Sequence, residues 1–276
     1  MSLAATIPET ARPDPTTAKR WLGRAGMAWL LVALAGQMIF ALYVAVIYGG
    51  VLTGGGYESW NRSPAQAYRP GDGFGNLIFG LHAIFSIVII AGGVAQLIPT
   101  LRQRMPAFHR WTGRTYMVSA AILSLGGIAL IAWRGTVGNG IMHAGTISNG
   151  IAILICAGMA WMLARRRQFD AHRRWALRLF LCVSGVWFFR VGLMAWLLTF
   201  RAPVGFDPKS FTGPFLEFLS FAQYLLPLAV LQLYLHAMDR GGAVLRWGMA
   251  GLLTVLALIT AFGIFGATMG MWLPRL

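Results

Sequence analysis

The chain has 276 residues, of which 57% are hydrophobic and only 11% are charged, and its formal net charge is +15. This composition excludes an ordinary soluble domain, in which about a quarter of the residues are charged. It also argues against nucleic-acid binding, because the basic residues lie in short loops between long apolar segments. The composition therefore indicates a protein that crosses a membrane several times.

Seven apolar segments have the length of a membrane span, and they occupy residues 27–48, 77–98, 116–133, 141–163, 175–198, 215–235 and 247–272. About 20 helical residues cross the hydrocarbon core, and only helices or closed barrels satisfy their backbone there. We predict an all-α membrane helical bundle of seven transmembrane helices, with residues 27–272 as one domain and a four-helix core unit at 76–200. Residues 1–26 contain three prolines and predict a disordered cytoplasmic tail.

The distribution of basic residues predicts the orientation of the bundle. Sixteen Lys and Arg residues fall on the side of the N-terminus and six on the opposite side, while Arg190 lies within a span. The positive-inside rule then places the N-terminus in the cytoplasm and the C-terminus outside. We expect a multi-pass protein of the inner (cytoplasmic) cell membrane whose basic loops contact anionic lipids.

Four of the five histidines recur at similar spacing. His82 precedes His109 by 27 residues, and His143 precedes His172 by 29 residues. Each pair belongs to one helical hairpin, formed by spans two and three or by spans four and five. The first histidine lies towards the outer side and the second at the inner mouth of the ascending helix. The pattern predicts a duplicated hairpin.

The inner histidines belong to two similar motifs, HRWTGR at 109–114 and HRRWALR at 172–178. Pro106 suits the first position of a helix, where its missing N–H costs nothing. Asp170 suits an N-cap. These signals predict that the two ascending helices begin near residues 106 and 171, which places both histidines at the membrane interface.

Paired histidines at two depths suit b-type haem, whose iron takes one imidazole from each side. The predicted axial pairs are His82 with His143 and His109 with His172. Haem propionates favour arginine, and the candidates are Arg110, Arg114, Arg173 and Arg178 at the inner level and Arg134 and Arg190 at the outer level. About 18 residues, or ~27 Å of helix, separate the levels. We therefore expect one or two haem b groups.

The pairing of helix two with helix four, and of helix three with helix five, resembles the arrangement in ascorbate-linked transmembrane cytochromes b. The stretch HRWTGR also resembles the His-Arg-Trp-x-Gly motif of ferric-reductase-like membrane domains. These resemblances imply a membrane oxidoreductase that transfers electrons across the membrane. The donor would be a quinol or a cytoplasmic redox partner.

A second resemblance covers residues 82–190 and carries no reaction with it. This region resembles the bacterial membrane-protein family catalogued as domain of unknown function 2306. The matching features are LH at 81–82, Gly93 with Gln96, the run LRQRMPAFHRWTGRTY at 101–116, AHRRWALR at 171–178, and Arg190. The chain departs from that family at Ala176, where methionine is usual, and His143 is not part of the pattern.

Arg190 leaves two interpretations open, because an arginine inside a span requires a partner or a cavity. Glu217 on the next span is the candidate for an ion pair, and an anionic ligand is the alternative. Arg190 follows His172 by 18 residues, or five helical turns, which predicts one stripe of a continuous helix. The sequence leaves two non-redox functions as alternatives to haem binding. One is a binding or transport protein with an inner His/Arg anion site, and the other is a packing subunit of a larger membrane complex.

Overall fold

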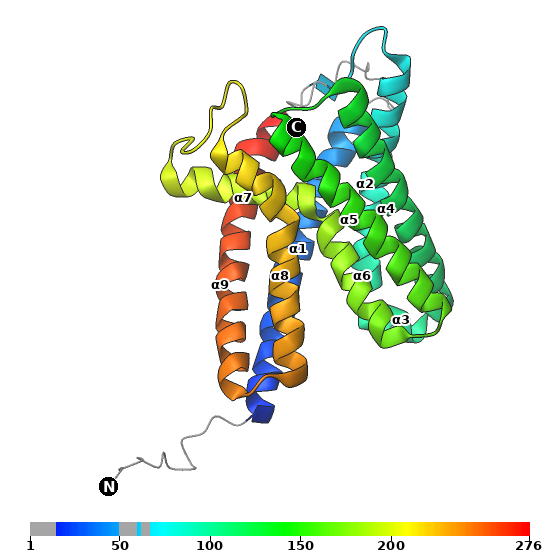
Figure 1. Cartoon of the computed structure of the whole chain (residues 1–276), viewed down its shortest axis with the longest axis vertical. Coiled ribbons are helices and arrows are strands. Elements are labelled where there is room, and N and C mark those ends of the chain that lie inside the picture. The colour runs from blue at the N-terminus through cyan, green and yellow to red at the C-terminus, as the bar shows by residue number, and fades with distance from the viewer. Residues whose placement is uncertain (1–14, 50–59, 62–66) are drawn as a thin grey trace.

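A computed structural model describes residues 15–49, 60–61 and 67–276 (Figure 1). The described residues form helices and connecting loops, with a single isolated bridge between Asp207 and Thr212. The predicted all-α helical bundle is confirmed. Chain order gives α1 (Pro15–Gly49), α2 (Gly73–Leu97), α3 (Pro99–Arg104), α4 (Pro106–Arg134), α5 (Gly140–Arg165), α6 (Phe169–Val183), α7 (Gly185–Phe200), α8 (Pro214–Arg240) and α9 (Ala243–Ala267).

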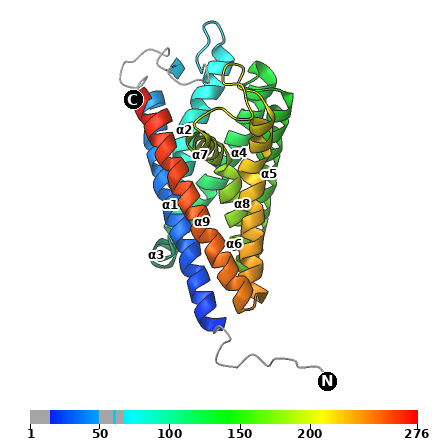
Figure 2. The same ribbon diagram turned by 90° about the vertical axis from the view of Figure 1, so that its left-hand side faces the viewer.

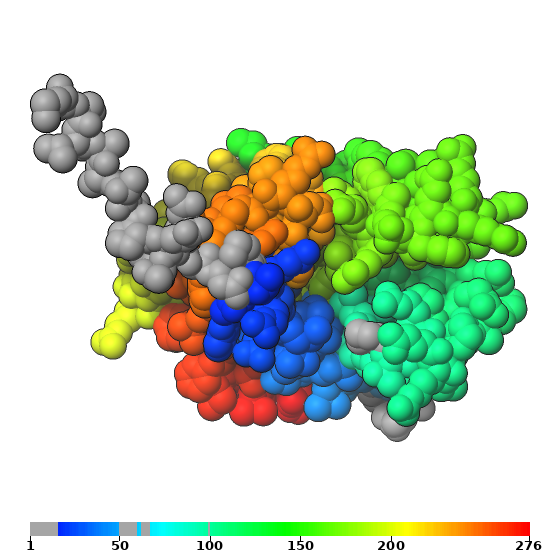
Figure 3. All heavy atoms as spheres, turned by 90° about the horizontal axis from the view of Figure 1, so that it is seen from below, coloured from blue at the N-terminus to red at the C-terminus, as the bar shows by residue number. Residues whose placement is uncertain are grey.

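The helices form two groups that lie side by side, α2 to α6 in one and α1, α8 and α9 in the other (Figures 1 and 3). Helix α7 crosses from the first group to the second and packs on α8 and α9. The described chain starts at one end of the bundle, together with the starts of α4 and α6, and we call this the inner end. The C-terminus lies at the opposite, outer end (Figure 2).

Local sequence signals explain most of the helix starts. The Asp72 side chain caps α2 by accepting a 2.9 Å hydrogen bond from the Gly75 N–H, and Asn139 caps α5 by accepting a 3.1 Å bond from Met142. Pro106 is the first residue of α4, as predicted. Helix α6 begins at 169, two residues before the predicted start, so Asp170 lies in its first turn rather than at the N-cap.

The prediction of a disordered tail over residues 1–26 is wrong for residues 15–26, which form the first turns of α1. Residues 1–14 lie outside the described residues. The reason is packing: Leu22 is fully buried in a cluster with Ala237, Met249 and Leu253 of α8 and α9. Lys19, Arg20 and Arg24 therefore project from an ordered helix that extends beyond the apolar segment.

The fifth predicted span is broken rather than continuous. Six helices can each cross a membrane, and α6 with α7 supplies a seventh span only as a pair that bends by 53° at Ser184. Ser–Gly pairs are common sites of helix kinks, and Gly185 follows Ser184. Gln37 donates a 2.9 Å hydrogen bond to the Ser184 hydroxyl, and Asn149 donates a 3.1 Å bond to the Cys182 carbonyl. These contacts satisfy polar groups at the break, and the predicted straight stripe from residue 172 to 190 is wrong.

Candidate functional site

The inner end of α4 and α6 brings two predicted ligands together. His109 lies in the first turn of α4 and His172 in the first turn of α6, close enough to interact electrostatically. Nδ1 of His172 lies 2.9 Å from the Ala160 carbonyl oxygen. A carbonyl can only accept, so Nδ1 carries the hydrogen, and the neutral ring presents its lone pair on Nε2. Metal-binding histidines in proteins commonly have this arrangement.

In His109, by contrast, one ring nitrogen lacks a hydrogen-bond partner among the described residues. Its Nδ1 is buried and has no hydrogen-bond partner in the described part of the chain. Gln96 of α2 holds the backbone nearby, because its Nε2 donates to Thr112 Oγ1 at 2.5 Å and to the His109 carbonyl at 3.2 Å. Buried polar atoms in folded proteins are almost always paired. A bound group that contacts Nδ1 would satisfy this atom of His109.

The last arginine of each motif stacks on the tryptophan of the same motif. The Arg114 guanidinium lies 4.9 Å from the centre of the Trp111 ring, and Arg178 lies 5.0 Å from Trp175. Arg178 also donates to Gln232 of α8. Trp-x-x-Arg is therefore the shared structural element of the motifs, because residues three apart are neighbours on a helix. Of the four inner arginines predicted to bind haem propionates, Arg110 and Arg173 are exposed and do not stack on a tryptophan of the described residues.

The predicted outer pair, His82 and His143, is not brought together in the same way. His82 of α2 packs against α4, where its Cε1 would lie 3.4 Å from a β-carbon at Gly127, and its Nδ1 is buried without a partner. His143 Nε2 lies 3.1 Å from the Thr136 carbonyl in the α4–α5 connection. The electrostatic neighbour of His82 within the described residues is Arg190 rather than His143.

Residues 79–209 match the family described as "Predicted membrane protein (DUF2306)". The match confirms the predicted resemblance over this region, which we call the DUF2306 segment. It contains the four paired histidines and Arg190, and its description names no reaction. No curated protein and no solved structure matches the chain.

Arg134 of the DUF2306 segment was expected at a haem propionate, and its contacts contradict that role. Its side chain is only 6% exposed and forms a 2.5 Å ion pair with Asp72. It also donates to the Ala67 carbonyl at 3.0 Å and to Asn76 Oδ1 at 2.8 Å. Hydrogen bonding from Gly75 and from Arg134 holds the pKa of Asp72 below its usual value. Arg134 therefore clamps the end of α4 to the start of α2.

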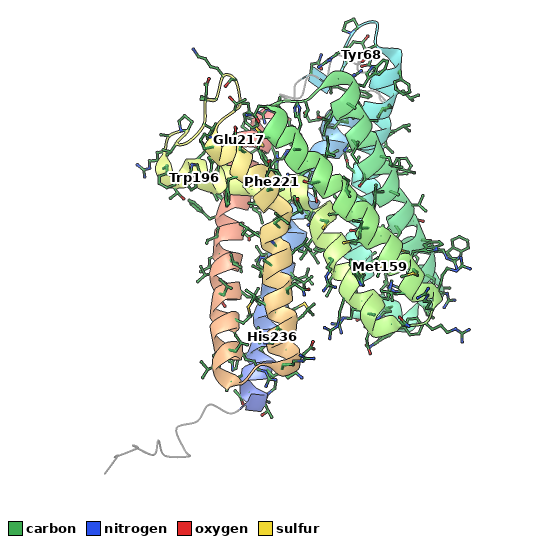
Figure 4. All side chains as sticks on the ribbon, viewed as in Figure 1. Tyr68, Met159, Trp196, Glu217, Phe221 and His236 are labelled. Carbon is green, nitrogen blue, oxygen red and sulfur yellow. The ribbon has the colours of Figure 1, made fainter. Side chains whose placement is uncertain are left out.

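The predicted ion pair between Arg190 and Glu217 is also wrong. Glu217, at the start of α8 (Figure 4), accepts a 2.7 Å hydrogen bond from Asn139. The Arg190 guanidinium lies 5.2 Å from the centre of the Phe40 ring of α1 and donates a 3.1 Å bond to the Val186 carbonyl. Because the chain bends at Ser184, Arg190 reaches α1 instead of the carboxylate on α8.

The surroundings of Arg190 include residues that the sequence did not point to. Tyr43 and Tyr48 of α1 and Arg275 at the C-terminus lie within electrostatic reach of its guanidinium. These residues lie outside the DUF2306 segment and carry no motif. Hydropathy marked the tyrosines only as part of a span and Arg275 only as an outer basic residue, so the group depends on how α1, α7 and the C-terminus pack.

Proposed function

We propose that the protein binds one b-type haem between α4 and α6 at its inner end, that His109 and His172 would hold it, and that the protein transfers electrons in the membrane. The observation that carries the proposal is the position of both histidines in the first turns of these helices, within electrostatic reach of each other. His172 is fixed through Nδ1 with its Nε2 lone pair unused, and the nearby His109 has a buried ring nitrogen without a partner.

The residues at the inner end fit this group. The hydrogen bond from His172 to the Ala160 carbonyl fixes the ring and raises the basicity of the opposite nitrogen. Gln96 fixes the backbone of His109 against α2. Arg110 and Arg173 lie next to the two histidines and are exposed, so they can bind propionates at the aqueous edge. A bound haem would supply one-electron redox chemistry.

The proposed setting is the cytoplasmic face of the inner membrane. Basic residues concentrate at the inner end, where the positive-inside rule places the cytoplasm. The opposite positions of the first described helix and the C-terminus agree with an odd number of crossings (Figure 1). The redox partner is then a quinol in the lipid or a cytoplasmic protein that reaches this face.

The test is the absorption spectrum of the protein purified from cells supplied with haem, before and after addition of a reductant. We expect a Soret band that shifts on reduction and that is lost or strongly reduced in both His109→Ala and His172→Ala. His236→Ala is the matched control, because His236 lies towards the inner end of α8 (Figure 4) and outside the proposed site. This variant should keep the band.

A colourless wild-type protein would overturn the proposal, as would an unchanged band in both single variants. A colourless protein that still binds inorganic phosphate through Arg110 and Arg173 would favour the second candidate, a non-redox protein with an inner anion site. The exposure of these two arginines beside paired histidines supports that candidate.

A further inference from the structure

Two arginines from distant parts of the chain lie at the same aromatic cluster in the outer half of the bundle. The Arg190 guanidinium of α7 lies 5.2 Å from the centre of the Phe40 ring, and Phe40 lies 5.3 Å from Trp272, three residues before Arg275 in the last turn of the chain. The two guanidinium groups are within electrostatic reach of each other. Each arginine makes one hydrogen bond to its own helix, Arg190 to Val186 at 3.1 Å and Arg275 to Met271 at 2.6 Å. A guanidinium has five N–H donors, so most of their donor capacity remains for another partner.

No Asp or Glu side chain of the described residues pairs with Arg190 or Arg275. Asp72 pairs with Arg134, and Asp239 pairs with Arg174 at the inner end. Glu217 accepts from Asn139, and Asp207 accepts from Lys209 and Ser210 within its own loop. Asp170 lies in the first turn of α6, at the inner end. Arginines within a membrane are costly unless they meet a partner, and like charges that approach each other raise that cost.

Unpaired hydrogen-bond donors gather in the same region. The indole nitrogens of Trp187 and Trp272 are buried without a partner in the described structure. Trp272 packs 5.3 Å from Phe40, the ring beneath Arg190, and Trp187 belongs to the same buried cluster. An indole N–H can only donate. The missing partner is therefore a hydrogen-bond acceptor, and the arginines require it to be negatively charged.

Both arginines follow irregular stretches of helix. Arg190 lies in the second turn of α7, directly after the break at Ser184, and a broken helix inside a membrane commonly directs its positive N-terminal end at an anion. Arg275 follows a π-helical turn at Thr268–Trp272, a rare conformation that is frequent at functional sites. The two irregularities place these arginines within reach of each other.

We propose that Arg190 and Arg275, together with the indole N–H groups of Trp187 and Trp272, form a binding site for a phosphate-type oxyanion in the outer half of the bundle. The phosphate is borne either by a lipid headgroup or by a free solute. Phe40, Tyr43 and Trp272 form the apolar wall of the site. The site uses none of the residues assigned to the inner haem, so either proposal can fail without the other.

The experiment measures the unfolding temperature of the full-length protein in a neutral detergent. Inorganic phosphate is added in one series, and phosphatidylglycerol or phosphatidylcholine in mixed micelles in two others. Stabilisation by phosphate identifies a soluble oxyanion, and stabilisation by phosphatidylglycerol alone identifies a lipid headgroup. No difference between phosphatidylglycerol and phosphatidylcholine, together with no effect of phosphate, would overturn the proposal.

Arg190→Gln separates binding from folding. Without ligand, this variant should unfold at a higher temperature than the wild type, because it removes a charge within the bundle that has no acidic side-chain partner among the described residues. Its affinity for the stabilising anion should fall roughly ten- to hundredfold. Arg275→Gln should also weaken binding, whereas Arg201→Gln, an exposed arginine at the end of α7, should leave it unchanged. A less stable Arg190→Gln with unaltered anion affinity would show a purely structural arginine.

Discussion

The inner and outer ends of the protein accommodate positive charge in opposite ways. At the inner end, arginines such as Arg114 stack on tryptophans, and Arg174 pairs with Asp239 while both side chains stay more than 40% exposed (43% and 42%). In the outer half, Arg134 is 6% exposed and fully paired, and Arg190 lies among aromatic rings without a carboxylate. Water solvates the inner charges, whereas the outer ones depend on protein partners or a ligand. An arginine without an acidic partner therefore marks a candidate ligand site. The number of arginines does not, because the arginines at the membrane interface of the inner end are solvated.

The largest effect is expected from breaking the outer clamp. Arg134→Met removes the ion pair and the hydrogen bonds that join the end of α4 to the start of α2. We expect a loss in the free energy of unfolding that exceeds the ~1 kcal/mol of an exposed pair, because the side chain of Arg134 is 6% exposed and that of Asp72 is 24% exposed. Denaturant unfolding of the purified protein measures it, and a loss below about 1 kcal/mol would show that the clamp behaves like a surface pair.

The clamp should also respond to acid. The folded pKa of Asp72 is lowered from 3.8 by the Gly75 N–H and by Arg134, so its contribution to stability is present above the unfolded pKa. That contribution disappears as the pH falls through the lowered folded value. Asp72→Asn should therefore be less stable than the wild type at about pH 6, and the two should converge below the folded pKa. Equal stabilities at about pH 6 would contradict the role of Asp72.

The smallest effect is expected at the inner ion pair. Arg174→Met removes a 2.8 Å contact with Asp239 between two exposed side chains, and such pairs contribute about 0–1 kcal/mol. Measured beside Arg134→Met in the same unfolding series, this variant isolates the effect of burial. A loss as large as that of the outer variant would remove the distinction between the two ends.

The sequence predicted the membrane fold because local signals and hydropathy agreed along most of the chain. Pro106 marked the first residue of α4, and the long apolar segments marked the spans. The break at Ser184 was missed because hydropathy continues across it. The Ser184–Gly185 pair was its only local signal, and the polar contacts that accompany the break come from Gln37 and Asn149, which are distant in the sequence.

The candidate sites were predictable to different degrees. The motifs predicted that His109 and His172 lie in the first turns of their helices, and the structure confirms this for α4 and α6. That they bind one haem stays a prediction. The partner of Arg190 depended instead on how α7 turns after the break. Glu217 was the one acid well within a predicted span, yet the bend directs Arg190 to Phe40 and Arg275. Contacts that depend on a bend between helices have no signature in hydropathy or spacing.

The number of haem groups per chain tests the central claim most directly, because the claim assigns a redox group to the inner end only. Haem extracted from a known amount of purified protein, produced with ample haem supply, should correspond to about one group per chain. The His82→Ala variant should keep that group. Two groups per chain would mean that the outer histidines also bind haem, and none would contradict the assignment of His109 and His172 as ligands.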